Sequence, residues 1–444
     1  ADSTPAVRPH AVTAHPAPGE LPADVPDLIG RLARRDPDAT AVLDTTPDGA
    51  THPVPRGELW RRVRALAEEL REHGVGPGDA VGVWLPNWSD VLVWHTAVAA
   101  RGAHVVGINT RYGAEEVTHL LERARPRLVA LAHDFHGLDL LARLRDATAR
   151  AGVVPTVAVV AGPGRAAEDP GGSDVGAGAW VPARDDGPEP APSDPAGLAV
   201  AFTTSGSTGL PKLAAHTGHG VLAHTVADAA VLGLGEDDVV LGALPLSGVF
   251  GYNAVTAALA AGARVLLEPT FDADRVLDHM AEHGVTHVAA GDDLVLRLAE
   301  AWSGSTRDLS AWRWWGVADF QGHARELAAR VTRELGTRVV GLYGSSEIFA
   351  LAATWPSDEP APGCWSAGGR VVHPDAEVRV ADPASGAVLA LGHDGELQFR
   401  GPNVVDAYLG ADVPEARTAD GWFRSGDLGA LVDDGAFTYR MDNK

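Results

Sequence analysis

The stretch Thr204-Ser205-Gly206-Ser207-Thr208-Gly209-Leu210-Pro211-Lys212 decides how this chain is interpreted. It follows an apolar run at Leu198–Thr203 that predicts a strand, and it precedes a stretch with helical spacing. Its glycines let backbone N–H groups approach phosphate oxygens, its hydroxyls add donors, and Lys212 adds a positive charge. A Gly/Ser/Thr-rich loop alone is more often a plain turn, but the full string with Pro-Lys is far more specific. We therefore predict a phosphate-binding loop, and not a Walker loop, because G-x-x-x-x-G-K-[ST] is absent.

Around this loop the sequence alternates between strands and helices. The apolar runs Ala80–Leu85 and His104–Ile108 flank a helical stretch at about 89–101, which is a βαβ pattern. After residue 370 the texture changes to short alternating segments, which indicates a small, mostly antiparallel piece. The chain is thus expected to have an α/β fold. Further strands are expected at Val239–Ala243, Ala263–Leu267, His287–Ala290, Trp314–Val317, Val339–Tyr343, Glu377–Ala381, Gly395–Arg400 and Phe437–Arg440.

The expected domain organisation follows from shifts in composition. Residues 1–24 are rich in Pro, Ala and His and are predicted to be a loosely ordered lead-in. Residues 161–197 are crowded with Gly, Pro, Asp and Ala and predict a surface connection. The predicted units are a first α/β region at 25–160, a second at 198–370 and a small β region at 371–439.

Composition excludes some classes of partner. The 444 residues carry 59 acidic and 36 basic side chains, a net charge of −23, which argues against nucleic acid because phosphate contacts need clustered Lys and Arg. The alternative explanation of this net charge is that it serves only to keep the protein soluble. Cys364 is the one cysteine, so no internal disulfide forms and a reducing compartment is expected. No apolar run is long enough for a membrane span and no signal peptide is seen, so the cytoplasm is the default prediction.

With these features in place, the loop resembles the phosphate loop of the adenylate-forming superfamily, which includes acyl-CoA synthetases, peptide-synthetase adenylation domains and luciferases. The resemblance extends over almost the whole chain. Gly74–Leu85 with Pro86-Asn87-Trp88, and Gly107-Ile108-Asn109-Thr110-Arg111-Tyr112, look like the N-terminal segments of fatty-acyl and aryl CoA ligases. The resemblance implies two doubly wound, mostly parallel sheets packed with helices, plus a small distorted antiparallel β-barrel near the C-terminus.

The same resemblance implies a nucleotide site. Tyr343-Gly344-Ser345-Ser346-Glu347 is similar to the family's Tyr-Gly-x-Thr-Glu segment, so Tyr343 is expected to stack on adenine, Ser346 to contact the α-phosphate and Glu347 to hold Mg²⁺. Thr204 is expected beside Glu347 as a second metal ligand, and Lys212, Ser346 and Glu347 are the expected catalytic residues. The nucleotide-binding set is Thr204, Ser205, Gly206, Ser207, Thr208, Gly209, Lys212, Ala318, Asp319, Phe320, Tyr343, Gly344, Ser345, Ser346, Asp427 and Arg440.

Three segments supply the rest of that set. Phe423–Gly429 resembles the family's Thr-Gly-Asp segment, which implies that Asp427 accepts both ribose hydroxyls; a turn aspartate is the alternative. Val317-Ala318-Asp319-Phe320 stands where the family has its small-residue adenine segment, although the end of a core strand explains it as well. Tyr439-Arg440-Met441-Asp442 resembles the hinge before a C-terminal domain, with Arg440 on the ribose or phosphate. The resemblance implies a hinge at 440–444, and with the C-terminal domain absent the chain is expected to bind ATP but to adenylate poorly.

The acid pocket departs from the family pattern. Leu244-Pro245-Leu246-Ser247-Gly248 lacks the Phe-His of acyl-CoA ligases and the nearby Asp with which amino-acid adenylation domains pair the substrate's α-ammonium. We therefore expect an enlarged pocket for a bulky carboxylic acid without a free α-amino group, the alternative being a merely reshaped loop. The expected walls are Gly248, Phe250, Tyr252, Asn253, Gly316, Ile348 and Phe349.

The expected function is ATP-dependent activation of that acid to acyl-AMP with release of pyrophosphate, as the first half-reaction of an acyl-CoA ligase. The expected cofactors are ATP and Mg²⁺, with coenzyme A as the acceptor in the complete enzyme. Two alternatives stay open at this point: an acyl-AMP ligase that loads the phosphopantetheine of a carrier protein, and a degenerate nucleotide- or acyl-binding protein without catalysis. The intact motifs at Lys212, Glu347 and Asp427 argue against degeneration.

Overall fold

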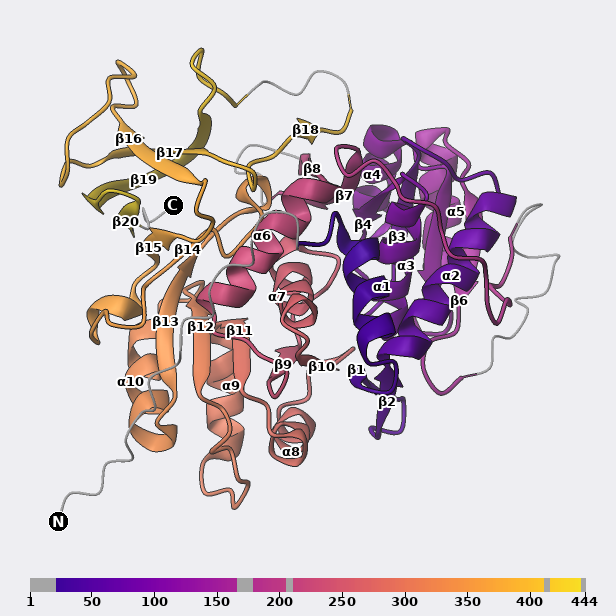
Figure 1. Ribbon diagram of the computed structural model, residues 1–444, viewed down its shortest axis with the longest axis horizontal. Helices are drawn as coiled ribbons and strands as arrows, with labels where there is room; N and C mark the ends of the chain where they lie inside the picture. The colour runs from indigo at the N-terminus through magenta and orange to yellow at the C-terminus, as the bar shows by residue number, and fades with distance from the viewer. Residues whose placement is uncertain (1–20, 166–178, 205–210, 411–415, 441–444) are drawn as a thin grey trace.

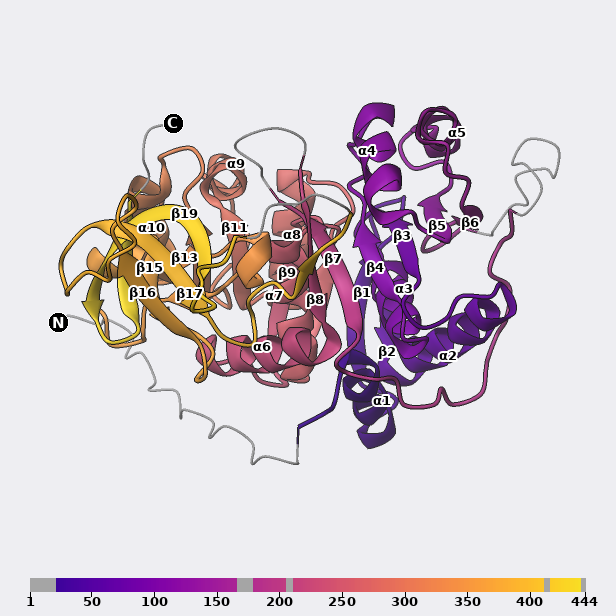
Figure 2. The ribbon, with the colours of Figure 1, turned by 90° about the horizontal axis from the view of Figure 1, so that it is seen from above.

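The computed structural model describes residues 21–165, 179–204, 211–410 and 416–440. The described strands form two sheets, one of seven and one of thirteen strands, with helices packed on them. Figure 1 shows the smaller sheet with its purple helices beside the larger sheet, and Figure 2 shows the two units from above. Residues 1–20 of the predicted lead-in at 1–24, loop residues 205–210 and hinge residues 441–444 lie outside the described part.

The smaller sheet holds the predicted βαβ unit, and five neighbouring strands on one side of this sheet run parallel to one another. The strands of this sheet in spatial order are β18 (Ala407–Tyr408), β8 (Leu213–Thr217), β7 (Leu198–Thr203), β4 (His104–Gly107), β3 (Ala80–Trp84), β5 (Leu128–Ala132) and β6 (Thr156–Val160). The helices that follow its strands or precede them are α2 (Arg56–Glu72), α3 (Ser89–Ala100), α4 (Ala114–Ala124) and α5 (Leu140–Ala151), with α1 (Val25–Arg35) packed on α2 and α3.

The larger sheet has a parallel half and an antiparallel half. The parallel strands are β13 (Arg338–Tyr343), β12 (Trp314–Ala318), β11 (His287–Gly291), β9 (Val239–Gly242), β10 (Arg264–Leu267) and β1 (Thr40–Thr45), with β2 (Thr51–Pro55) antiparallel at the edge. The helices among them are α6 (Gly218–Val231), α7 (Val249–Ala260), α8 (Ala273–His283), α9 (Asp292–Trp302) and α10 (Ala324–Leu335).

The antiparallel half continues from β13 and is the orange-to-yellow part of Figure 1. Its strands in spatial order are β14 (Ala353–Thr354), β15 (Gly368–Val371), β20 (Ala436–Arg440), β19 (Phe423–Asp433), β17 (Gly395–Arg400) and β16 (Glu377–Ala381). Two short 3₁₀ helices, η1 (Ser346–Ile348) and η2 (Gly363–Trp365), lie in the connections. The predicted two-sheet α/β fold with an antiparallel piece is confirmed, whereas closure of that piece into a barrel is not among the strand pairings of the described residues.

Each sheet contains strands from both sides of the 161–197 connection. β1 and β2 precede the smaller sheet in the chain but pair into the larger one, through β10. β7, β8 and β18 follow the 161–197 connection but belong to the smaller sheet. Strands from both sides of the connection therefore meet in each sheet, and the segment boundaries drawn from composition stay a prediction.

One sequence expectation about the phosphate loop is wrong. The chain does not enter a helix after Lys212; it forms β8, which pairs antiparallel with β7, and α6 begins only at Gly218. The run Leu213-Ala214-Ala215 has no strand preference of its own, so the cross-strand pairing with β7 decides its conformation. The 204–212 loop therefore joins two antiparallel strands, β7 and β8, and is not followed directly by a helix.

Candidate nucleotide and acid site

The neck of the phosphate loop is closed by Thr204 and Lys212. The backbone N–H of Thr204 donates to the carbonyl of Lys212 at 2.9 Å, and the N–H of Lys212 donates to Oγ1 of Thr204 at 3.3 Å. The predicted loop residues Ser205, Gly206, Ser207, Thr208 and Gly209 lie outside the described residues. The neck nevertheless fixes where the loop begins and ends.

Lys212, Glu347 and Tyr408 gather beside this neck. The ammonium of Lys212 lies 5.3 Å from the centroid of the Tyr408 ring, which β18 brings against β8. Burial raises the pKa of the Glu347 carboxyl, while the nearby charge of Lys212 acts in the opposite direction. Burial likewise raises the pKa of the Tyr408 hydroxyl, and the neighbouring Glu347 carboxylate raises it further. The structure thus brings together the two predicted catalytic charges and adds Tyr408, which the sequence did not single out.

Lys212 is also of a residue type that is rare in this chain. The chain has 36 basic residues but only two lysines, Lys212 and Lys444. A lysine is a compact charge on a flexible stem, whereas arginine presents a wide planar fork. A chain that uses arginine for nearly every other cation keeps a lysine at the loop, which fits a point contact with phosphate.

The third expected catalytic residue, Ser346, lies in η1 directly before Glu347. Its Oγ donates to the carbonyl of Thr203 at 2.7 Å, at the end of β7. The segment that follows is strained, because Phe349, Ala350 and Leu351 have φ of 55°, 31° and 44°. Each non-glycine residue in this left-handed region costs roughly 1 kcal/mol. The segment also folds back on Gly344, where an added Cβ would lie 2.7 Å from Cα of Ala350.

The expected adenine residue Tyr343 ends the parallel strand β13, and the expected ribose residues Asp427 and Arg440 lie on the antiparallel strands β19 and β20. The hydroxyl of Tyr343 donates to Oδ2 of Asp427 at 2.8 Å. The Tyr343 ring stacks on Phe399 with 5.7 Å between centroids and packs edge-on against Phe437. Arg440 lies on β20 opposite Leu428, the residue after Asp427, and pairs with Asp394 at 2.7 Å. Tyr343 therefore contacts Asp427, and Arg440 lies on the neighbouring strand, whereas the roles of these residues toward a nucleotide stay a prediction.

Asp292, which the sequence did not indicate as a site residue, holds the end of the expected adenine segment at Ala318–Phe320 in place. Asp292 is fully buried at the start of α9, and its carboxylate accepts backbone N–H bonds from Phe320, Gln321 and His323 at 2.9–3.1 Å. Burial alone would raise the pKa of Asp292, but these bonds outweigh it and hold that pKa below its usual value. Phe320 is 64% exposed and Asp319 is half-buried. The segment after Ala318 is thus a fixed loop that presents an exposed aromatic ring.

The expected acid-pocket walls are split between two environments. Tyr252 and Phe349 are buried and pack edge-on with 6.5 Å between ring centroids. Asn253 is fully buried as well, and its Nδ2 donates to Oδ2 of Asp228 at 2.5 Å. Ile348 lies elsewhere, in the apolar cluster of the antiparallel strands together with Tyr343. The structure brings together Tyr252, Asn253 and Phe349 but not Ile348.

The remaining acid-pocket candidates differ in the space around them. A Cβ added at Gly248 would meet only the carbonyl oxygen of Pro245, at 3.6 Å, so this position has room for a side chain. A Cβ at Gly316 would lie 2.3 Å from the ring of Trp314. Trp314 and Phe250 both pack against the large core cluster that contains Phe349, so Trp314 joins the acid-pocket candidates. The Trp312-Arg313-Trp314-Trp315 run was the signal for it in the sequence.

Among the described residues, no group of three or more His, Cys, Asp or Glu side chains has the arrangement of a metal site. A lone Glu347 beside a phosphate loop nevertheless fits Mg²⁺, which proteins usually bind with one or two carboxylates plus substrate phosphates. The hydroxyl of Thr204 takes part in closing the loop neck, so its expected role as a metal ligand stays a prediction.

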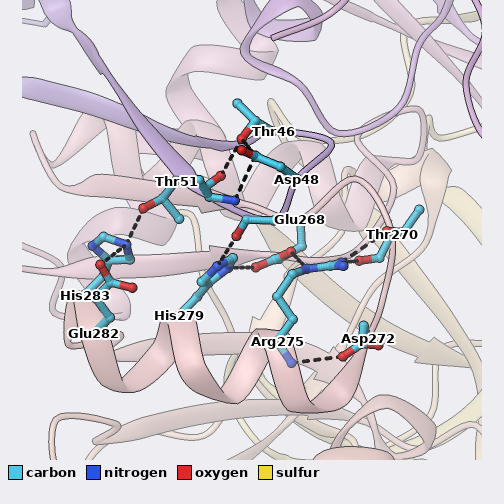
Figure 3. Close-up of polar contacts among 12 residues, drawn as sticks. Thr46, Asp48, Thr51, Glu268, Thr270, Asp272, Arg275, His279, Glu282 and His283 are labelled. Carbon is cyan, nitrogen blue, oxygen red and sulfur yellow. Dashed lines mark hydrogen bonds and ion pairs between the residues drawn. The ribbon is translucent and has the colours of Figure 1, made fainter. Parts of the chain in front are cut away.

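A second polar cluster lies on elements that carry none of the predicted site residues (Figure 3). Nδ1 of His279 contacts Oε1 of Glu268 at 2.5 Å, and its Nε2 contacts the carbonyl of Gly49 at 3.0 Å. Arg275 donates to Oε2 of the same glutamate at 3.3 Å. This cluster ties α8 and β10 to the β1–β2 hairpin.

Comparison with known proteins agrees with this geometry. The family model described as "AMP-binding enzyme" matches residues 30–409, and the chain belongs to this family. The resemblance to the adenylate-forming superfamily, in its acyl-CoA synthetase branch, is thereby confirmed, and the chain is an enzyme of the AMP-forming acid–thiol ligase class. No helix in the described part of the chain combines the length and apolar character that crossing a bilayer requires.

Individual relatives place the chain among ligases of varied acids. It is 30% identical over 431 residues to the 3-[(3aS,4S,7aS)-7a-methyl-1,5-dioxo-octahydro-1H-inden-4-yl]propanoyl:CoA ligase of Rhodococcus jostii, with 94% of this chain and 78% of that protein covered. It is 28% identical to the salicyl-AMP ligase/salicyl-S-ArCP synthetase of Mycobacterium tuberculosis, covering 92% and 71%. A solved structure of a putative long-chain-fatty-acid CoA ligase from Rhodopseudomonas palustris matches with a TM-score of 0.75 at 25% identity, covering 94% and 98%.

Proposed function

We propose that this chain binds ATP with Mg²⁺ along the 204–212 loop, Glu347 and Asp427, and joins a bulky carboxylic acid to AMP. The observation that carries the proposal is the convergence of three elements. The hairpin neck supplies Lys212, η1 supplies Glu347, and the end of β13 together with β19 supplies the Tyr343–Asp427 pair. Phosphate, metal and ribose contacts are thus available within one region.

In the proposed reaction a carboxylate oxygen attacks the α-phosphorus of ATP, the bond to the bridging oxygen of the β-phosphate breaks, and pyrophosphate leaves. Lys212 and the loop amides hold the β- and γ-phosphates. Ser346 contacts the α-phosphate once its hydroxyl proton turns from the Thr203 carbonyl to a phosphate oxygen. Glu347 would hold Mg²⁺, which neutralises phosphate charge when bound. The protein contributes positioning and charge stabilisation rather than a covalent step. A thiol then attacks the acyl carbon, and AMP leaves.

Asp427 is proposed to fix the ribose and Tyr343 to pack on adenine. An ionised carboxylate has about four lone-pair sites. Oδ2 of Asp427 accepts the bond from Tyr343, and we propose that the ribose hydroxyls donate to the same carboxylate. Tyr343 in turn holds the carboxylate in one orientation.

The proposed substrate is an acid with a large apolar body and no free α-amino group. The room at Gly248 supports this, since the glycine leaves space next to the start of α7. Asp228, the acidic side chain of α6 that contacts Asn253, is buried and accepts the Asn253 amide, so it is already engaged. The bicyclic acid named for the Rhodococcus relative supports the same size class.

Product analysis with the full-length protein tests the substrate class. Alanine, benzoate, octanoate and a polycyclic propanoate are each incubated with ATP, Mg²⁺ and coenzyme A, and AMP and acyl-CoA are measured. We expect the polycyclic acid to give the highest rate. Preference for alanine would overturn the proposed class.

The second candidate acceptor is a carrier-protein phosphopantetheine, which the name of the salicyl-AMP ligase relative favours. Product analysis with and without coenzyme A separates the two. Acyl-CoA formation supports coenzyme A as acceptor, whereas accumulation of acyl-AMP regardless of coenzyme A supports the carrier protein.

A further inference from the structure

The segment from Ser346 to Ala350 carries the proposed phosphate and metal contacts, yet it is not held by a strand or a long helix. Instead, its carbonyls are held by donors from other parts of the chain. His216 Nε2 donates to Ser346 O at 2.7 Å, and Val405 N donates to Glu347 O at 2.6 Å. Farther along, Asn403 Nδ2 donates to Ile348 O at 2.9 Å.

Ala350 O receives two donors. His224 Nε2 lies 3.1 Å and Asn253 Nδ2 lies 3.4 Å from this oxygen, and both nitrogens also contact Oδ2 of Asp228, at 3.2 Å and 2.5 Å. Both side chains are fully buried, as are His216 and Asn403 to within a few per cent. The four side chains come from β8, α6, α7 and the loop after β17, so both sheets contribute to holding one short segment.

His216 and His224 can donate to these carbonyls only if Nε2 of each ring carries a proton. Burial lowers the pKa of both His216 and His224 to about 4, so both rings are neutral near pH 7. A neutral imidazole carries one N–H, and a carbonyl can only accept. The proton must therefore sit on Nε2 in both rings.

The need for these donors follows from backbone strain. Three successive non-glycine residues, Phe349 to Leu351, lie in the left-handed region. Such a conformation persists only where the surroundings over-determine it. Without the carbonyl donors the segment has a lower-energy path back to ordinary φ values, and Ser346 and Glu347 would move with it.

We infer that His216, His224, Asn253 and Asn403 are positioning residues that set the location of Ser346 and Glu347 by holding the carbonyls of Ser346, Ile348 and Ala350. This inference rests on the proposed function, in which those two residues contact the α-phosphate and Mg²⁺. It assigns Asn253 to the support of the nucleotide site instead of the wall of the acid pocket.

The test compares His224→Leu, which removes the donor, with His224→Gln, whose amide nitrogen reaches the place of Nε2. His216→Leu and His216→Gln form a second pair, and His219→Leu on the exposed face of α6 is the control. ATP affinity is measured by calorimetry with and without Mg²⁺, together with acid-dependent pyrophosphate exchange and the melting temperature, all on the full-length protein.

We expect the leucine variants to lose at least about tenfold of the Mg²⁺-dependent gain in ATP affinity and of the exchange kcat, since a displacement near 1 Å costs up to about a hundredfold. The KM for the acid should stay within about twofold, and the glutamine variants and His219→Leu should stay within about threefold of wild type in every value. Folded leucine variants with unchanged Mg²⁺-dependent affinity would overturn the inference, and so would glutamine variants that lose as much as the leucine variants.

If the leucine variants do not fold, Asn403→Leu applies the same readouts to a donor that lies in a loop. A folded Asn403→Leu protein with wild-type Mg²⁺ dependence would overturn the inference, and a tenfold loss would support it. Failure of the proposed function looks different, because wild-type protein would then show neither Mg²⁺-dependent ATP binding nor acid-dependent exchange.

Discussion

The hydroxyl of Tyr343 donates a hydrogen bond to Oδ2 of Asp427 at 2.8 Å, which joins the end of the parallel strand β13 to the antiparallel strand β19. The two residues are 84 positions apart in the sequence. Their contact places the expected adenine and ribose residues in one unit, supported from behind by Phe399 and Phe437.

This relationship predicts graded effects on ATP binding. Tyr343→Phe removes the hydroxyl that orients Asp427 but keeps the ring, and is expected to weaken ATP binding about fivefold, because a typical hydrogen bond contributes about 1 kcal/mol. Asp427→Ala removes the ribose acceptor and should weaken binding about 10- to 100-fold, the range for hydrogen bonds to a charged group. Equilibrium titration with ATP measures both, and ATP binding by Asp427→Ala at wild-type strength contradicts the assignment.

The scarcity of lysine gives a direct probe of the phosphate loop. An acetylating reagent is expected to modify Lys212, and saturating Mg²⁺–ATP should slow that modification at least about tenfold, because phosphate oxygens would occupy the ammonium. Peptide mass spectrometry measures the rate. Lys444, which lies outside the described residues, is the internal reference, and equal protection of both lysines contradicts a phosphate contact at Lys212.

Two glycines at the start of α7 predict opposite consequences of added side chains. Gly248→His should fold normally, since a Cβ there meets only one atom at 3.6 Å, and should reduce turnover of a polycyclic acid relative to octanoate at least about tenfold. At Gly251 a Cβ would lie 2.5 Å from the carbonyl oxygen of Pro245, so Gly251→Ala should lower the melting temperature by several degrees. Unchanged acid selectivity in Gly248→His means that Gly248 does not border the acid.

The cluster in Figure 3 predicts a pH-dependent contribution to stability. The hydrogen bond to Glu268 is the main cause that raises the pKa of His279 above its usual value of 6.5, and burial opposes it. Since the folded pKa exceeds the unfolded one, the stabilisation is complete below about pH 6.5 and is lost as pH rises through the folded pKa. Wild-type protein should therefore lose stability relative to His279→Gln between pH 6.5 and 8.5, measured by urea unfolding.

That comparison cancels the groups shared by both proteins, among them His283, whose pKa is lowered by burial. A stability difference between wild type and His279→Gln that stays constant over this range would show that protonation of His279 does not stabilise the folded protein.

The sequence predicted where strands and helices lie better than it predicted which strands pair with each other. Apolar runs such as Ala80–Leu85 predicted buried parallel strands because their burial on both faces leaves a continuous apolar signature. The strand at Leu213–Thr217 was missed, since its alanines favour helix and only the pairing with β7 makes it a strand. The pairing of β1 with β10 across some two hundred residues leaves no local signal at all.

In the candidate site, too, the residues in sequence motifs were predicted, whereas the residues defined by tertiary contacts were missed. Lys212 was predicted from the phosphate-loop string, and Tyr343, Glu347 and Asp427 from segments that resemble the family's motifs; their roles stay predictions. Asn253 was expected to line the acid pocket, but it is fully buried with Asp228 and the carbonyl of Ala350 as partners. Asp292 was passed over because an aspartate at a helix start is ordinary in sequence, and only the folded loop shows its three backbone donors.

The central claim is that this protein activates a carboxylic acid with ATP, and acid-dependent exchange of labelled pyrophosphate into ATP by the full-length protein tests it most directly. We expect exchange that requires both a carboxylic acid and Mg²⁺, needs no thiol, and falls at least about a hundredfold in Lys212→Gln or Glu347→Gln. ATP binding without acid-dependent exchange for any acid class, or exchange that is indifferent to both substitutions, would contradict it.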